Sequence, residues 1–216
     1  IGEVFAVVKP GNLLESWRVL ELCVDAGFIV IMQAANTGLT GGSTPYGANY
    51  DRPIVIINTM RIDDIHFIDE GKQIIAFPGS TLFDLENKLA PIGREPHSVI
   101  GSTSIGASIV GGVCNNSGGS LIQRGPAYTE LSIYAQVNDK GELKLINDLG
   151  IELGSSPEEI LTNLQEKNYT SNQVQFPDKL ASDNEYEKRL RAINQKTPAR
   201  FNADKRRLYG VSGSAG

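Results

Sequence analysis

The chain is poor in histidine and cysteine, the residues on which much nucleophilic and metal chemistry depends. It has only His66, His97, Cys23 and Cys114. No Cys-x-x-Cys pair occurs, so a zinc site is not supported and no metal is expected. We expect both cysteines to be buried free thiols. His66 lies in an apolar strand-like run, which predicts a structural histidine, and no Gly-x-Ser-x-Gly sequence is present. A Ser-His-Asp hydrolase is therefore poorly supported.

Long apolar runs and an excess of positive charge are also missing. No run reaches the roughly 18 residues that a membrane-crossing helix needs. The formal net charge of -5 argues against a chain that binds nucleic acid as a whole. The hydrophobic content of 40% is that of a globular protein with a real core.

Two glycine-rich stretches dominate what the sequence does contain, namely AANTGLTGGS at 34–43 and GSTSIGASIVGGVCNNSGG at 101–119. Both are flanked by apolar runs and are nearly free of charge. Glycine lets a ligand approach bare backbone N–H groups, so the pair predicts a cradle for a large anion such as a pyrophosphate-containing cofactor. His97, just before the second stretch, is a candidate ligand contact. Ordinary tight turns are the alternative interpretation.

The common phosphate-binding motifs are absent. Gly38, Gly41 and Gly42 do not have the Gly-x-Gly-x-x-Gly spacing of the Rossmann fold. The Walker pattern is missing as well, because the only Gly-Lys pair, Gly71-Lys72, is followed by glutamine. A phosphate-binding chain of this sequence therefore needs a different fold.

The apolar periodicity predicts helices interspersed with strands, some of them joined as hairpins. Asn12 and Glu15 predict a helix start, and Gly27 predicts its end. The mixture is typical of an α+β fold. Strands are expected at 4–8, 28–32, 54–57, 65–68, 73–77, 131–137 and 143–146, with further helices at 80–90 and 156–164. The strand at 28–32 is expected to be buried.

A family resemblance rests on these same segments. The runs PGNLLESWRVLELC and AANTGLTGGSTPYG resemble the FAD-binding domain of the vanillyl-alcohol oxidase family, and so do the glycines and asparagines at 111–119. The runs GREPHSVIGSTSIGAS and CNNSGGSLIQRGPAYTE are similar to the bacterial quinone-dependent D-lactate dehydrogenases. The similarity extends to TPARFNAD and the terminal SGSAG.

The resemblance implies a non-Rossmann, PCMH-type FAD-binding fold of two subdomains, with mixed sheets and flanking helices. Many relatives carry an arginine or histidine in the first glycine-rich stretch, residues 34–43, which we call the first loop. Some of them bind the flavin covalently through that histidine. This chain has Ala34 and Ala35 there, so we expect FAD to be bound non-covalently. The implied cofactor-binding residues are Ala34, Ala35, Asn36, Thr37, Gly38, Gly42, Ser43, Gly101, Ser108 and Gly118.

The expected organisation has three parts. Residues 1–149 form the FAD-binding domain, with subdomains at about 1–60 and 61–149. Residues 150–208 form a polar, partly mobile insertion, and residues 209–216 return to the domain. Because the chain starts at Ile1 and stops in a glycine-rich turn, we expect a fragment of a longer protein, with the catalytic residues in the missing C-terminal part.

The resemblance further implies that the whole enzyme oxidises D-lactate to pyruvate and passes the electrons through the flavin to a membrane quinone. It would lie peripherally on the cytoplasmic face of the bacterial inner membrane. Another 2-hydroxy-acid or sugar-acid flavoenzyme of the same fold, the reductase of cell-wall precursor synthesis and a non-catalytic anion-binding module remain alternatives.

A basic segment follows the glycine-rich part of the chain. Residues 188–207 carry eight lysines and arginines and one acid, Asp204. Such a run suits an anionic membrane surface, where each well-placed cation contributes about 1 kcal/mol. A solvated face or flexible insertion is the alternative.

Overall fold

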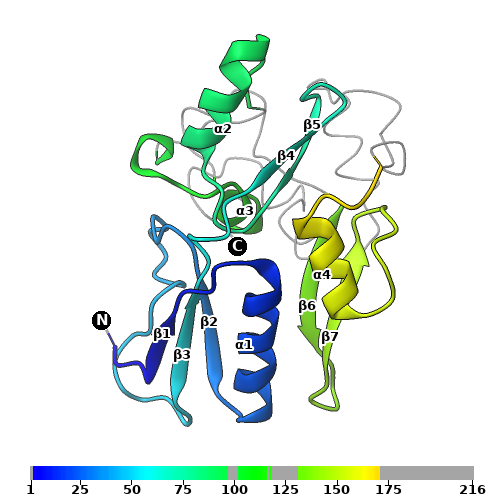
Figure 1. Cartoon of the computed structure of the whole chain (residues 1–216). Coiled ribbons are helices and arrows are strands. Elements are labelled where there is room, and N and C mark those ends of the chain that lie inside the picture. Colours follow the sequence, from blue (N-terminus) through cyan, green and yellow to red (C-terminus); the bar gives the residue numbers. More distant parts are fainter. Residues whose placement is uncertain (1, 97–101, 116, 118–130, 171–216) are drawn as a thin grey trace.

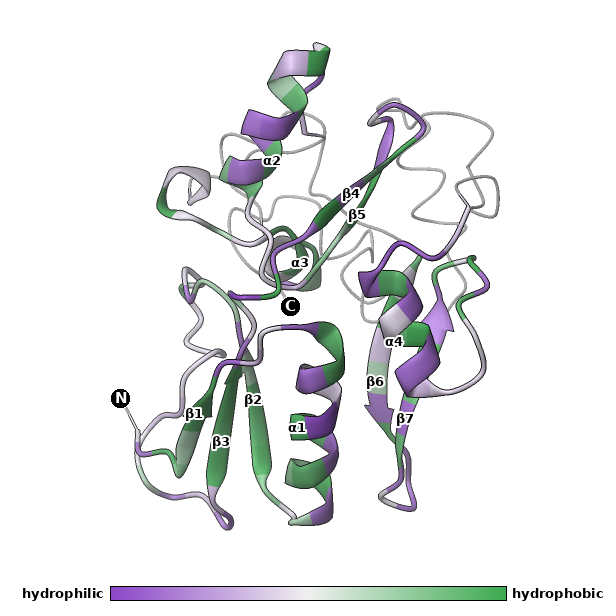
Figure 2. Cartoon of the chain, viewed as in Figure 1, coloured by the Kyte–Doolittle hydropathy of each residue, from purple (hydrophilic) through white to green (hydrophobic). Residues whose placement is uncertain are grey.

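A computed structural model describes residues 2–96, 102–115, 117 and 131–170. Its first unit is a parallel three-stranded sheet with the strand order β1-β3-β2. The strands are β1 (Ala6–Val8), β2 (Ile29–Gln33) and β3 (Ile54–Asn58). The central strand β3 is buried along its whole length, which explains why its sequence is an unbroken apolar run. Figures 1 and 2 show this sheet and its apolar strands.

Helix α1 (Leu13–Asp25) connects β1 to β2 and covers one face of the sheet. The Asn12 side chain accepts a hydrogen bond from the Glu15 backbone N–H at 2.8 Å and caps the helix. At the other end Gly27 has a φ of +70°, a conformation that glycine adopts without strain. Cys23 on α1 packs with Val55 and Ile57 of β3 to form the first hydrophobic core.

A hairpin begins the second unit. Strands β4 (Ile65–Ile68) and β5 (Gln73–Ala76) pair antiparallel, and helix α2 (Leu82–Leu89) follows them. Thr81 caps α2 by accepting from the Asp84 N–H at 3.1 Å. Two short 3-10 helices come next, η1 (Ala90–Ile92) and η2 (Thr103–Ile105), and then helix α3 (Ile109–Cys114).

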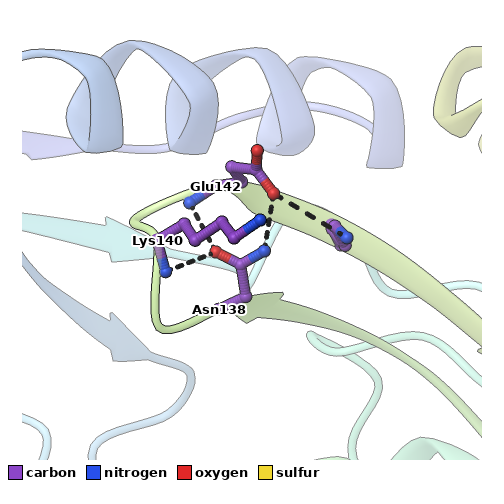
Figure 3. A network of polar contacts seen from close by, with 4 residues as sticks. Asn138, Lys140 and Glu142 are labelled. Atoms are coloured by element: carbon purple, nitrogen blue, oxygen red, sulfur yellow. Dashed lines mark hydrogen bonds and ion pairs between the residues drawn. The ribbon is translucent and has the colours of Figure 1, made fainter.

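A second antiparallel hairpin pairs β6 (Ser132–Val137) with β7 (Leu143–Asp148). Its turn is organised by one side chain, that of Asn138 (Figure 3). The Asn138 Oδ1 atom accepts from the backbone N–H groups of Lys140 and Glu142, both at 2.9 Å, while its Nδ2 donates to the Glu142 carboxylate. The side chain thus replaces part of a backbone turn, as asparagine does in short hairpins.

Helix α4 (Pro157–Gln165) lies against the second unit and completes a second hydrophobic core. This core unites Ile62, Ile68 and Phe77, around the first hairpin, with apolar side chains far along the chain. Those side chains are Ile151, Leu153, Ile160 and Leu164. The predicted boundary at residue 149 stays a prediction, but the packed part of the chain continues through α4. The rest of the predicted insertion, from residue 171, lies outside the described residues.

The two units meet where the segment after β3 crosses the segment before α2. A Cβ atom on Gly79 would lie 2.2 Å from the carbonyl oxygen of Thr59 and 2.9 Å from that of Ile62. Gly79 also donates its backbone N–H to the Ile62 carbonyl at 2.8 Å. Only a glycine leaves room for two backbones at this separation.

Each strand and helix expected at residues 4–96 and 131–165 is present, with ends that differ by no more than two residues. Two expectations of burial were wrong. Strand β2 is only half-buried, and Met32 is 51% exposed, because β2 is an edge strand. Cys23 is buried as expected, but Cys114 is exposed. Within the described ranges no helix has both the length and the apolar character needed to cross a membrane.

We expect the Gly79→Ala substitution to lower the free energy of unfolding by about 3 kcal/mol, because the added methyl group would overlap backbone atoms that cannot rotate away. Urea unfolding of the chain without ligand measures this. The matched control is Gly38→Ala, whose Cβ would meet no described atom within 4 Å. Equal stability of the two variants would contradict the close crossing.

Candidate cofactor-binding site

The first glycine-rich loop begins at the carboxyl end of β2. The strands of a parallel sheet end at the same edge, and in Figure 1 this edge points toward the unit that contains α2 and α3. Ligands of open parallel sheets bind at the carboxyl ends of the strands. The loop that the sequence singled out therefore lies at the edge where a bound anion is expected.

Side-chain hydrogen bonds hold this loop in a defined shape. The Gln33 Nε2 atom donates to the Ser43 carbonyl at 2.8 Å, which draws the two ends of the loop together. The Ser43 hydroxyl donates to the Asn36 Oδ1 atom at 2.6 Å. Asn36 has a φ of +55°, a left-handed conformation that asparagine tolerates better than most residues. Asn36 and Ser43, which are both predicted to bind the cofactor, are thus hydrogen-bonded to each other.

The glycines of the loop are not explained by packing. No described atom lies within 4 Å of a Cβ built on Gly38, and on Gly42 the nearest is the Thr40 hydroxyl at 3.9 Å. Within the described residues the backbone N–H groups of Thr37, Gly38 and Gly42 also lack a hydrogen-bond acceptor. The loop carries no charged side chain. An uncharged loop with open glycines and free N–H donors suits a phosphate group.

Of the second glycine-rich stretch, which we call the second segment, the structure describes residues 102–115 and 117, with Ser108 among them. Ser108 is 5% exposed and caps α3, since its hydroxyl accepts from the Gly111 N–H at 3.1 Å. Because that hydroxyl is engaged in capping, a cofactor would meet the backbone here rather than a free side chain. The segment is attached to the start of α2 by a bridge between Thr81 and Ser108 and by the Ile109 N–H, which donates to the Ser80 carbonyl at 2.9 Å.

The remaining predicted residues divide into two groups. Ala34, Ala35 and Thr37 lie half-buried in the first loop, where the sequence placed them. Gly101, Gly118 and His97 lie outside the described residues. The contacts of all these residues with a cofactor stay predictions, and no catalytic residue is assigned. Within the described part of the chain no cluster of histidine, cysteine and acidic side chains could hold a metal ion.

His66 lies in the second core, away from the loop. It is 2% exposed, its Nδ1 atom is 2.8 Å from the Tyr169 hydroxyl, and its ring packs 4.9 Å from the ring of Phe77. Burial lowers the pKa of His66 below its ordinary value of 6.5, and the charge of Lys167 lowers it further, while Asp64 acts in the opposite direction. The expectation of a structural histidine agrees with this position.

Sequence reasoning missed the residues that support the first loop. Gln33 and Asn58 are the last residues of β2 and β3 and lie opposite each other in the sheet, and Thr59 follows Asn58 directly. They were overlooked because they complete otherwise apolar runs. Both strands end in a residue with an amide side chain, and this shared feature is a signal that could have identified Gln33 and Asn58.

The geometry and the fold together define a class. The described part of the chain contains no Rossmann sheet, yet it presents an uncharged, glycine-rich loop with free N–H donors beside a second glycine-containing segment. The donor set fits the pyrophosphate of a dinucleotide such as FAD, and we read the chain as a dinucleotide-binding α+β domain.

Comparison with known families makes the class specific. The family described as "FAD binding domain" matches residues 5–144, which is more than half of the chain. The chain belongs to this FAD-binding family, and the predicted cofactor, FAD, is thereby confirmed.

Relatives and solved structures agree with this assignment. The chain is 60% identical over 215 residues to a quinone-dependent D-lactate dehydrogenase of Haemophilus influenzae and 56% identical to that of Escherichia coli. It aligns over its whole length but spans only 38% of each of these relatives. The family resemblance expected from the sequence is confirmed.

Solved structures bear on the fold alone. An alkyldihydroxyacetonephosphate synthase matches 72% of this chain and 28% of its own, with a TM-score of 0.51 and 16% identity. Cholesterol oxidase from B. sterolicum matches 65% of this chain and 29% of its own, also with a TM-score of 0.51 and 16% identity. With the family match, these likenesses confirm the predicted α+β, non-Rossmann FAD-binding fold.

The lowered pKa of His66 predicts how stability changes with pH. The unfolded chain takes up a proton on this histidine near pH 6.5, whereas the folded chain resists protonation. The contribution of His66 is therefore complete above about pH 6.5 and falls by up to about 1.4 kcal/mol per pH unit below it, until the folded pKa is reached.

Urea unfolding at pH 7.5, 6.5 and 5.5 measures this change in stability with pH. All three values lie above the range in which most carboxylates titrate. The His66→Gln variant should show a flatter dependence than the parent chain. A parent slope that is unchanged in His66→Gln would show that other groups cause it.

Proposed function

We propose that this chain is the FAD-binding part of a respiratory D-lactate dehydrogenase and binds FAD without a covalent bond. The observation that carries the proposal is the first loop, whose glycines face open space and whose N–H groups lack acceptors among the described residues. No histidine occurs at 34–43, where a covalent attachment would be expected from the resemblance. The 60% identity to a relative of that name supports the choice of enzyme.

The residues of the chain bind and orient the cofactor. Backbone N–H groups at Thr37, Gly38 and Gly42 would donate to the pyrophosphate oxygens, and Asn36 and Ser43 would fix the loop around it. The segment at Ser108 would meet the cofactor from the second unit. Such donors are already in place before binding, so little ordering is required when the anion arrives.

Once bound, FAD would supply a two-electron acceptor for the hydride from C2 of D-lactate, and the hydroxyl proton would pass to a base, so that pyruvate would be formed. Because the relatives are quinone-dependent enzymes, we propose that a quinone is the final acceptor here as well. We place the groups that bind lactate and take its proton in the part of the relatives that this chain does not cover. We also propose that residues 188–207, with their eight cations, bring the protein to an anionic membrane surface on the cytoplasmic side.

We expect FAD to raise the melting temperature of the chain and ATP to raise it much less. FAD at a hundredfold its dissociation constant should add about 2.7 kcal/mol of stability. The Gly38→Val variant should melt like the parent chain without ligand, because its side chain enters open space, but should lose the FAD shift. Ala135→Val, on the exposed part of β6, is the matched control.

Absence of an FAD shift in the folded parent chain would contradict the proposal. A shift that survives in Gly38→Val would remove the first loop from the site while leaving FAD binding intact.

The substrate is tested on the whole protein that contains this chain. We expect D-lactate, added without oxygen, to bleach the visible flavin absorbance, and L-lactate to bleach it far more slowly. Equal bleaching by both isomers, or none by D-lactate, would contradict the proposed substrate. The products of the reaction are checked by assaying pyruvate.

A further inference from the structure

A buried amide side chain supports the first loop from below. Asn58, at the end of β3, is 9% exposed. Its Nδ2 atom donates to Gln33 Oε1 at 3.0 Å and to the Ala34 carbonyl at 3.2 Å, and its Oδ1 atom accepts from the Met60 N–H at 3.3 Å. Each polar atom of the amide therefore has a partner, and two of these partners belong to the base of the loop.

The support continues into the loop itself. Gln33 receives the Asn58 hydrogen bond on Oε1 and uses its Nε2 to donate to the Ser43 carbonyl at 2.8 Å. An amide that accepts on one side and donates on the other has a fixed orientation. Because Ser43 in turn bonds Asn36, the buried Asn58 is connected to the left-handed turn of the loop through three hydrogen bonds.

The neighbouring residue reaches the second unit. Thr59 is 3% exposed, and its backbone N–H donates to the Gln33 carbonyl at 2.8 Å. Its hydroxyl lies 3.2 Å from the Pro78 carbonyl and 3.4 Å from the Gln33 carbonyl. Two residues beyond Pro78, the Ser80 carbonyl accepts from Ile109 of the second segment.

We propose that Asn58 and Thr59 are positioning residues of the FAD site, which set the shape of the first loop and its register against the segment at Ser108. This rests on the proposed binding of FAD by the loop. Neither residue touches the cofactor in this proposal. Asn58 acts through Gln33 and Ala34, and Thr59 acts through the Pro78 carbonyl at the crossing of the two units. Polar groups buried in this way are costly to leave unpaired, so removal of one partner disturbs the others.

The experiment measures FAD affinity and stability on the same variants. The dissociation constant comes from the quenching of flavin fluorescence, and the melting temperature is recorded without FAD. We expect Asn58→Ala, which removes all three hydrogen bonds of the Asn58 side chain, to weaken FAD binding at least about tenfold, since the loss of one buried hydrogen bond alone typically has an effect of this size. Thr59→Val, which keeps the shape but loses the hydroxyl, should weaken it several-fold, and Thr59→Ser should restore the parent affinity.

The control separates positioning from general stability. Asn163 on α4 also donates a side-chain hydrogen bond to a buried segment, from Nδ2 to the Leu153 carbonyl at 2.8 Å. Asn163→Ala should lower the melting temperature and leave the FAD dissociation constant unchanged. If Asn58→Ala does not fold, Asn58→Asp replaces it, because that variant keeps the acceptor for Met60 and loses both donors.

The outcomes are distinct. If the parent chain binds FAD and both Asn58→Ala and Thr59→Val bind it with an unchanged dissociation constant, the positioning role is overturned while the proposed function stands. If Thr59→Ser fails to recover the affinity lost in Thr59→Val, the hydroxyl is not the cause and the role of Thr59 is overturned. A parent chain that binds no FAD contradicts the proposed function and this proposal with it.

Discussion

The close contact between two backbones at Gly79 is the constraint on which the rest of the structure depends. The carbonyl oxygens of Thr59 and Ile62 occupy the space in which any larger residue would place its Cβ atom. At this crossing the parallel sheet and its glycine loop are brought next to the unit that carries Ser108. A site made from two units needs such a fixed junction, because catalytic and binding geometry tolerates little displacement.

Hydrogen bonds on both sides of the junction extend its effect. Thr59 reaches Pro78 across it, and Asn58 and Gln33 carry the constraint into the first loop. On the other side, the Ser80 carbonyl and the Thr81 bridge hold the start of α3. The two glycine-rich segments, separated by more than fifty positions in the sequence, are thus connected by short bonded steps rather than by loose packing.

Much of the fold could be predicted from the sequence, because its helices, strands and turns are specified by residues that are close together in the chain. The Asn12 cap, the apolar spacing of α2 and the hairpin turns at 69–72 and 138–141 each depend on neighbours a few residues away. The packing of α4 against the first hairpin could not be predicted from the sequence, because the polar composition after residue 149 concealed the few apolar side chains that enter the core. The supporting role of Asn58 was hidden for a similar reason, as it depends on a partner in another strand. The loop glycines stood out because no local turn explains them all.

The second core also has a consequence for the order in which the molecule folds. The first unit lies within residues 5–58, where even the pairing of Ala6 with Val55 closes a shorter loop than the contacts of the second core do, so this unit can form early. The second core joins Ile62 and Phe77 to Ile160 and Leu164, and the bond between Leu13 and Gln165 spans 152 positions. Contacts of such long range form slowly, because a large loop must close before they yield any stabilisation. During synthesis the glycine loop therefore leaves the ribosome well before α4 can lock the second unit, and an early chain exposes the apolar faces of its hairpin until then.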